Sequence, residues 1–107
     1  IEAAYRVGAN IIELNTGTFC DLLIENNKKE YLEEFEKLKE ASVYGKNLGL
    51  EIHGGHGLTF ESVKYIASIP EIRELNIGHF LISQAVFDGI EKTINTMRLE
   101  IDNSQKK

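Results

Sequence analysis

The residues of this chain best suited to proton-transfer chemistry are histidines beside glycines. His56 follows Gly54 and Gly55 and precedes Gly57, so the backbone there is free to approach a ligand and to adopt unusual φ values. A histidine titrates near neutral pH and can donate or accept a proton. His56 is therefore a candidate general acid or base. The alternative is a loop histidine that forms only local hydrogen bonds.

A carboxylate in an apolar run is a second candidate. Glu13 lies between Ile12 and Leu14, in a segment that we expect to be buried. A buried carboxylate is costly unless it is paired or used in chemistry. Glu13 is thus either a catalytic carboxylate or one half of an internal salt bridge to a Lys or Arg outside this segment.

A third candidate is the Gly78-His79 pair, which precedes the last predicted helix. Backbone amides at the start of a helix can bind an anion such as phosphate. The alternative is a tight strand-to-helix turn that needs glycine. Two glycine-rich strand ends together favour phosphate, whereas the absence of a Walker A or G-x-G-x-x-G motif gives nucleotide binding no support.

Metal and cysteine chemistry are not expected. His53 and His56 are spaced for a strand and a loop rather than for a known ligand pattern, so we predict no metal, and His53 is expected only to line the site. Cys20 is the single cysteine, which excludes an internal disulfide and a cysteine-rich zinc site. Cys20 has no convincing base partner in the sequence, so we do not expect it to act as a nucleophile.

Short apolar runs alternate with longer amphipathic ones, which predicts strands and helices in alternation. We expect strands at 10–15, 50–53 and 74–77, with turn residues at 16–18. Helices are expected at 1–7, 29–48, from Thr59 as N-cap to 69, and from 81 through a stripe of apolar residues ending at 101. The polar tail, 103–107, is predicted to be frayed.

Successive strands joined by helices of this length must be parallel, which makes the fold α/β. Functional groups in such folds collect at the C-terminal ends of the strands, where Glu13, His56 and Gly78-His79 would lie near each other. Three parallel strands leave two open edges, so residues 1–107 fit part of one larger domain. That domain is either a doubly wound sheet or a (β/α)₈ TIM barrel.

The composition of the chain excludes some classes of binding partner. The chain has 12 Lys and Arg against 17 Asp and Glu, a net charge of −5, and 42% hydrophobic residues. The acidic balance predicts no nucleic acid and no anionic membrane as a partner. No apolar run approaches the ~20 residues of a membrane span. We expect a soluble, cytoplasmic domain.

Three segments resemble a known family: IELNTGTFCD, the longer stretch containing GGHGLT and ELNIGH, and the final amphipathic helix. They are similar to the C-terminal part of the pyridoxine 5′-phosphate synthase family of vitamin B6 biosynthesis. The resemblance implies a (β/α)₈ TIM barrel of which these strands are the sixth, seventh and eighth. It also implies a homo-oligomer, an octamer in the best-known form, and no metal or organic cofactor.

The resemblance also implies roles for matching residues. His56 corresponds to the proton donor and Glu13 to a carboxylate that stabilises the transition state. Gly57 corresponds to a substrate contact, and Gly78 and His79 to a phosphate contact. The implied reaction joins two phosphorylated small molecules, 3-amino-2-oxopropyl phosphate and 1-deoxy-D-xylulose 5-phosphate, into pyridoxine 5′-phosphate, with release of phosphate and water.

The chain departs from the family at two positions beside the site. The family commonly has His or Tyr where this chain has Asn15, and Asn where it has His53, which puts substrate fit in doubt. The family's proton-accepting histidine, second catalytic glutamate and arginine phosphate ligands belong to its N-terminal half, so these 107 residues alone should be inactive. Alternatives are another phosphate-binding barrel enzyme, such as a sugar-phosphate isomerase or aldolase, and a non-catalytic half-barrel.

Overall fold

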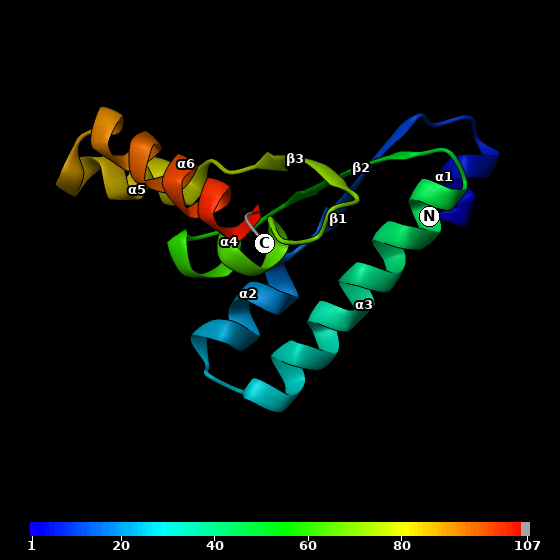
Figure 1. Ribbon diagram of the computed structural model, residues 1–107, viewed down its shortest axis with the longest axis horizontal. Helices are drawn as coiled ribbons and strands as arrows, with labels where there is room; N and C mark the ends of the chain where they lie inside the picture. The colour runs from blue at the N-terminus through cyan, green and yellow to red at the C-terminus, as the bar shows by residue number, and fades with distance from the viewer. Residues whose placement is uncertain (106–107) are drawn as a thin grey trace.

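The computed structural model describes residues 1–105, apart from the side chains of residues 2 and 4. Helices and strands alternate along the chain (Figure 1). In order they are α1 (Glu2–Arg6), β1 (Ile11–Asn15), α2 (Gly17–Ile24), α3 (Lys28–Asn47), β2 (Glu51–Gly55), α4 (Phe60–Ile66), β3 (Ile72–Asn76), α5 (His79–Asp88) and α6 (Ile90–Gln105). The predicted order is confirmed, with a helix added after β1 and the last helix divided in two.

The three strands are parallel, as the sequence predicts, and they form one sheet with β2 in the centre. The register aligns the last residues of the strands, because Asn15 pairs with Gly55 and Gly55 pairs with Asn76. The C-terminal ends of all three strands therefore meet at one edge of the sheet. This edge is where the candidate residues of the sequence were expected to lie.

The two faces of the sheet differ. One is apolar and packs against helices, and α3 approaches β2 so closely that a Cβ at Gly45 would lie 2.5 Å from Ile52 Cδ1. The other face carries mostly exposed polar side chains: Glu13, Asn15, Glu51, His53, Glu74 and Asn76. The expectation that Glu13 is buried is wrong, because no helix among residues 1–105 covers this face. The Cα radius of gyration of 14.3 Å also exceeds the ~13 Å typical of a compact domain of this length.

An aromatic cluster joins the helices below the sheet. Phe19 of α2 is fully buried, and its ring lies 6.2 Å from Tyr31, 5.9 Å from Phe35 and 5.5 Å from Tyr65 between ring centroids. This packing explains α2, which the local turn signals at 16–18 did not predict. Burial of an aromatic side chain outweighs the weak helix propensity of Gly17 at the start of the helix.

The final helical segment is broken where one long helix was expected. Gly89 has a φ of +85°, which ends α5, and α6 begins at the next residue. The two helices pack against each other at the left of Figure 1. Met97 is buried, but Val86 of the predicted stripe is 79% exposed. Helix α6 continues to Gln105, so the frayed tail is not found at 103–105, and residues 106–107 lie outside the described residues.

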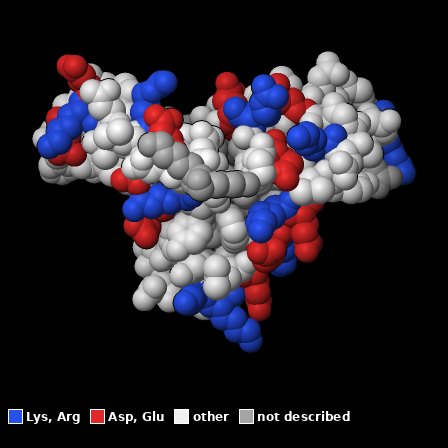
Figure 2. All heavy atoms as spheres, viewed as in Figure 1, with Lys and Arg blue, Asp and Glu red and all other residues white. Residues whose placement is uncertain are grey.

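Charged side chains of both signs are interspersed over the face of the molecule shown in Figure 2. Several of them pair along α3, where Lys39 lies 3.6 Å from Glu36. Among the helices of residues 1–105, none combines the length and the apolar character that a membrane span requires.

Candidate active site

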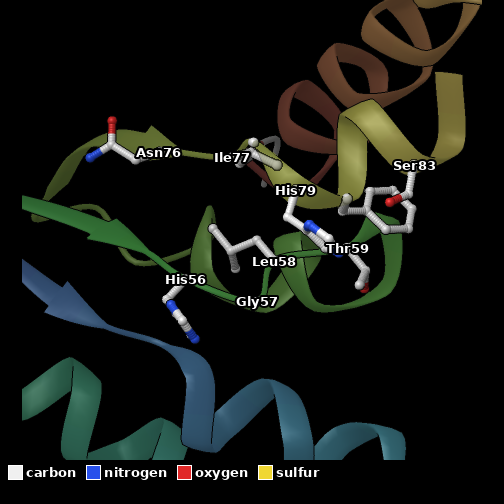
Figure 3. Close-up of a pocket in the computed structure, with 10 residues that line it drawn as sticks. His56, Gly57, Leu58, Thr59, Asn76, Ile77, His79 and Ser83 are labelled. Carbon is white, nitrogen blue, oxygen red and sulfur yellow. The ribbon is translucent and has the colours of Figure 1, made fainter.

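A cavity of about 520 Å³ opens at the C-terminal ends of β2 and β3 (Figure 3). Four of the five candidate site residues line it, namely His56, Gly57, Gly78 and His79. The other lining residues are Leu58, Thr59, Asn76, Ile77, Phe80 and Ser83. The two glycine-histidine segments, about twenty residues apart in sequence, therefore share one concave surface. Glu13 does not line the cavity but reaches Asn76, which does.

The His56 loop has a constrained backbone. His56 has a φ of +89° and Gly57 a φ of +76°, so two consecutive residues lie in the left-handed region. The His56 ring points toward the junction of β1 and α2 (Figure 3). A Cβ at Gly17 would lie 2.6 Å from His56 Cδ2, so the ring rests directly on the backbone of this junction. His56 is nonetheless exposed, which leaves the imidazole accessible for proton transfer.

Thr16 and Cys20 lie beneath this loop. Both are buried, and both contact the carbonyl oxygen of His56, from Thr16 Oγ1 at 2.7 Å and from Cys20 Sγ at 3.7 Å. A Cβ at Gly57 would lie 3.3 Å from the Cβ of Cys20. Gly57 thus has a structural reason to be glycine, in positive φ and in close packing, besides the substrate contact that the resemblance implies.

Burial raises the pKa of the Cys20 thiol, and the hydrogen bonds with Ser62 and Thr16 oppose this effect only in part. A thiol with a raised pKa is a poor nucleophile at neutral pH, because the thiolate is the reactive form. The structure therefore gives Cys20 a packing role under the His56 loop, in line with the expectation that it is not a nucleophile.

Glu13 crosses the central strand to reach the third one. The Asn76 side-chain amide donates a hydrogen bond to Glu13 Oε1. The path runs over Gly55, where a Cβ would lie 2.8 Å from Glu13 Oε1 and 3.1 Å from the Asn76 carbonyl oxygen. Gly55 is buried and leaves the gap through which the carboxylate passes. This hydrogen bond could not be predicted from local sequence, because the register that aligns residues 55 and 76 depends on tertiary structure.

The Gly78-His79 end is open. Nothing lies within 4 Å of a Cβ built on Gly78, and its φ of −131° is not in the left-handed region. Gly78 is the N-cap of α5 and has no side chain that could cap the helix. The first turn of α5 has no acidic residue. The positive end of the α5 dipole therefore faces the cavity without a competing carboxylate, which favours an anion there.

The loop that follows β2 is held by the start of α4. The Thr59 hydroxyl accepts a hydrogen bond from the Ser62 amide at 3.2 Å, and the Thr59 amide donates to Ser62 Oγ at 2.8 Å. This capping box confirms Thr59 as the predicted N-cap. Beside the cavity, the rings of Phe60 and Phe80 meet edge to face with centroids 4.7 Å apart, which joins α4 to α5.

His53 lies on the open sheet face rather than in the cavity. Its Nε2 lies 2.6 Å from a carboxylate oxygen of Glu51, and its Nδ1 lies 3.1 Å from one of Glu74. These contacts hold the ring between two carboxylates on neighbouring strands. Among the side chains that the structure describes, no three of His, Cys, Asp or Glu are arranged to hold a metal ion.

Sequence comparisons show what the chain is similar to. The model of the family described as "Pyridoxal phosphate biosynthesis protein PdxJ" matches residues 1–103. The pyridoxine 5′-phosphate synthase of Ruegeria pomeroyi is 47% identical over 105 residues, which cover 98% of this chain and 42% of the relative. The synthase of Roseobacter denitrificans is 47% identical over 102 residues, covering 95% of this chain and 41% of the relative. That of Cereibacter sphaeroides is 43% identical over 106 residues, covering 99% and 42%. The chain thus spans about two fifths of the length of these curated relatives.

Proposed function

The chain belongs to the PdxJ family of pyridoxal phosphate biosynthesis proteins, and on this basis we propose that it is the C-terminal part of a pyridoxine 5′-phosphate synthase. The whole protein would join 3-amino-2-oxopropyl phosphate and 1-deoxy-D-xylulose 5-phosphate into pyridoxine 5′-phosphate, releasing phosphate and water. The observation that carries the proposal is that His56, Gly57, Gly78 and His79 all line the same cavity.

We further propose that residues 1–107 are part of one (β/α)₈ TIM-barrel domain. In such a barrel one face of the sheet meets the helices and the other lines the interior. The three parallel strands have this division, with an apolar face under the helices and a polar face that no described helix covers. Strands from the rest of the barrel would pair with the free edges of β1 and β3 and enclose Glu13.

The site residues divide the chemistry between them. His56, which is exposed on the loop after β2, would donate a proton during ring closure, a step that needs an acid active near neutral pH. Glu13, held by Asn76, would stabilise positive charge that develops in the transition state. The amides of Gly78 and His79 at the start of α5 would bind a substrate phosphate, and Gly57 would contact the amino-ketone substrate.

Such a set uses the chain's own acid, carboxylate and amides, and the proposal includes no metal or organic cofactor. The resemblance adds a homo-oligomer, an octamer in the best-known form, acting in the cytoplasm. The remaining catalytic groups would come from the N-terminal half of the barrel, so residues 1–107 alone would show no activity.

The test is to incubate the purified full-length protein with both substrates and to follow pyridoxine 5′-phosphate by its absorbance. Each substrate alone serves as a control. We expect product only with both substrates. Conversion of one phosphorylated substrate alone would instead indicate a sugar-phosphate isomerase or aldolase. No turnover of either substrate by the folded protein would indicate a non-catalytic barrel.

A further inference from the structure

The backbone at His56 is held in a conformation that it would rarely adopt alone. Its φ of +89° is unusual for a residue with a side chain, and only Asn26 shares a positive φ among the non-glycine residues that the structure describes. Asn26 is of a type that tolerates the left-handed region, whereas His56 is followed by a second positive φ at Gly57. Such a conformation persists where the surroundings hold it in place.

Thr16 is the residue that holds it. Its side chain is fully buried, and its hydroxyl lies 2.7 Å from the His56 carbonyl oxygen and 2.9 Å from that of Gly55. The Gly55 carbonyl already accepts the backbone N–H of Thr16 at 2.8 Å. The Thr16 hydroxyl therefore donates its hydrogen bond to the His56 carbonyl oxygen. The other described donor to this oxygen is the Cys20 thiol, which is a weak donor and lies farther away.

The same junction also supports the ring. Gly17, next to Thr16, lies against the His56 ring, where a Cβ would come within 2.6 Å of Cδ2. The Gly17 amide is in turn fixed by Asn15, whose side-chain oxygen accepts its hydrogen bond at 2.8 Å. One short segment, residues 15–17, thus contacts His56 at the carbonyl oxygen on one side and at the imidazole on the other.

We propose that Thr16 is a positioning residue for His56, acting through a hydrogen bond from its hydroxyl to the His56 carbonyl oxygen. The bond fixes the left-handed backbone and, through it, the direction of the imidazole. Thr16 is buried and does not line the cavity, so it acts without touching a substrate. The proposal rests on the proposed function in one respect, the role of His56 as the proton donor.

The test compares Thr16→Val, which keeps the shape and removes the hydroxyl, with Thr16→Ser, which keeps the hydroxyl, both in the full-length protein. Misplacing a catalytic group by about 1 Å can cost roughly a hundredfold in rate. We therefore expect Thr16→Val to lower kcat per folded molecule by about 10- to 100-fold with a much smaller change in KM. Thr16→Ser should restore most of kcat.

Thr93 supplies a matched control. It is also fully buried, and its hydroxyl donates to the Gly89 carbonyl at 2.8 Å, but it lies in α6 away from the cavity. Thr93→Val should lose stability while keeping kcat per folded molecule. Equal loss of kcat in Thr93→Val and Thr16→Val would overturn the proposal, because the effect would then be general loss of packing.

Two further measurements keep the proposal testable. In a His56→Asn background, Thr16→Val should change kcat little, since the positioned group is already gone, and an undiminished effect would count against the proposal. Independently of turnover, the ¹⁵N-labelled imidazole of His56 should change its chemical shifts in Thr16→Val and not in Thr16→Ser. Should Thr16→Val fail to fold, Thr16→Ala is measured in the same way. A protein that makes no pyridoxine 5′-phosphate but shows these shifts would reject the proposed function and retain the positioning role.

Discussion

The two glycine-rich strand ends of this molecule look alike in sequence and differ in structure. At the end of β2, His56 and Gly57 lie in the left-handed region and pack on buried Thr16 and Cys20, and a Cβ at Gly57 would lie only 3.3 Å from the Cβ of Cys20. At the end of β3, Gly78 has an ordinary negative φ and nothing within 4 Å of where a Cβ would be. The first end is tightly packed on the side of α2, whereas nothing crowds Gly78 at the second.

This difference indicates two functions for glycine. Beside His56, glycine permits a backbone path that presents one side chain on a rigid loop. Before α5, glycine keeps space open in front of the amides of a helix N-terminus, where an anion would bind. We therefore expect the β2 end to determine the rate of proton transfer and the β3 end to determine affinity for phosphate.

The largest effect is expected for His56→Asn in the full-length protein. Loss of a general acid costs about 10²–10⁴ in kcat. Asparagine is a suitable replacement because it tolerates the left-handed region, so the loop should keep its conformation. The measurement is kcat per folded molecule together with the thermal unfolding midpoint. An unchanged kcat would show that His56 forms only local hydrogen bonds.

His53→Asn is the matched control for this prediction. His53 lies in β2, three residues before His56, but it contacts Glu51 and Glu74 on the open sheet face and does not line the cavity. We expect kcat to change far less than in His56→Asn. A comparable loss would assign the acid-base function to the open sheet face rather than to the β2 end.

The next effect is expected for Gly78→Val. The added side chain would enter the space in front of α5, and a lost charge-assisted hydrogen bond is typically worth ~1.5–3 kcal/mol, or about 10- to 100-fold in affinity. We expect KM to rise by this factor with little loss of stability, since Gly78 has neither positive φ nor close neighbours. Calorimetry with inorganic phosphate on the folded variant measures the affinity for phosphate directly. Normal phosphate affinity would remove the anion site from this strand end.

The β2 end should show the opposite response when glycine is replaced. Gly57→Ala forces a side chain into positive φ and toward the Cβ of Cys20, 3.3 Å away, and should lower the free energy of unfolding by about 1–2 kcal/mol. Gly78→Ala should change it by much less. Urea unfolding of both variants makes the comparison, and equal losses would mean that the two ends do not differ as the structure indicates.

The sequence predicted the alternation of strands and main helices along the chain because this alternation depends on local periodicity. The long α3, the Thr59 cap and the glycine-ended strands all carry local signals. Helix α2 was missed because its stability comes from Phe19, whose partners Tyr31 and Tyr65 lie in α3 and near the end of α4. The break at Gly89 was missed because the apolar stripe continues through it.

The candidate site was predictable to the extent that topology could be inferred. Parallel strands bring their C-terminal ends to one edge of the sheet, so the sequence alone predicts that His56 lies near Gly78-His79. The hydrogen bond between Glu13 and Asn76 needs the register across Gly55, and the contact of Thr16 with His56 needs the turn geometry. Neither leaves a periodic or compositional signal, so neither could be derived from the sequence.

The smallest effect concerns the packing beneath the β2 end and is read from Cys20. Burial raises the pKa of this thiol above its usual value near 9, so the unfolded chain loses the proton first as pH rises. The stabilising contribution is therefore complete below about pH 9 and is lost as pH rises through the higher pKa of the folded state. Relative to Cys20→Ala, the protein with Cys20 should therefore keep its stability up to about pH 9 and lose it progressively as the pH rises further, as measured by urea unfolding.

Thiol labelling compares the same packing with the open end. With iodoacetamide at pH 8, and with mass spectrometry to identify the labelled peptide, Cys20 should react at least about tenfold more slowly in the folded protein than in urea, because a buried structural thiol is inert. Ser83 is exposed and lines the cavity beside α5, so a Ser83→Cys variant reports on the other strand end. Its introduced thiol should react nearly as fast in the folded protein as in urea. Equal protection of the two thiols would show that the β3 end is filled in the full-length protein, and the anion site would then lose the open space on which it depends.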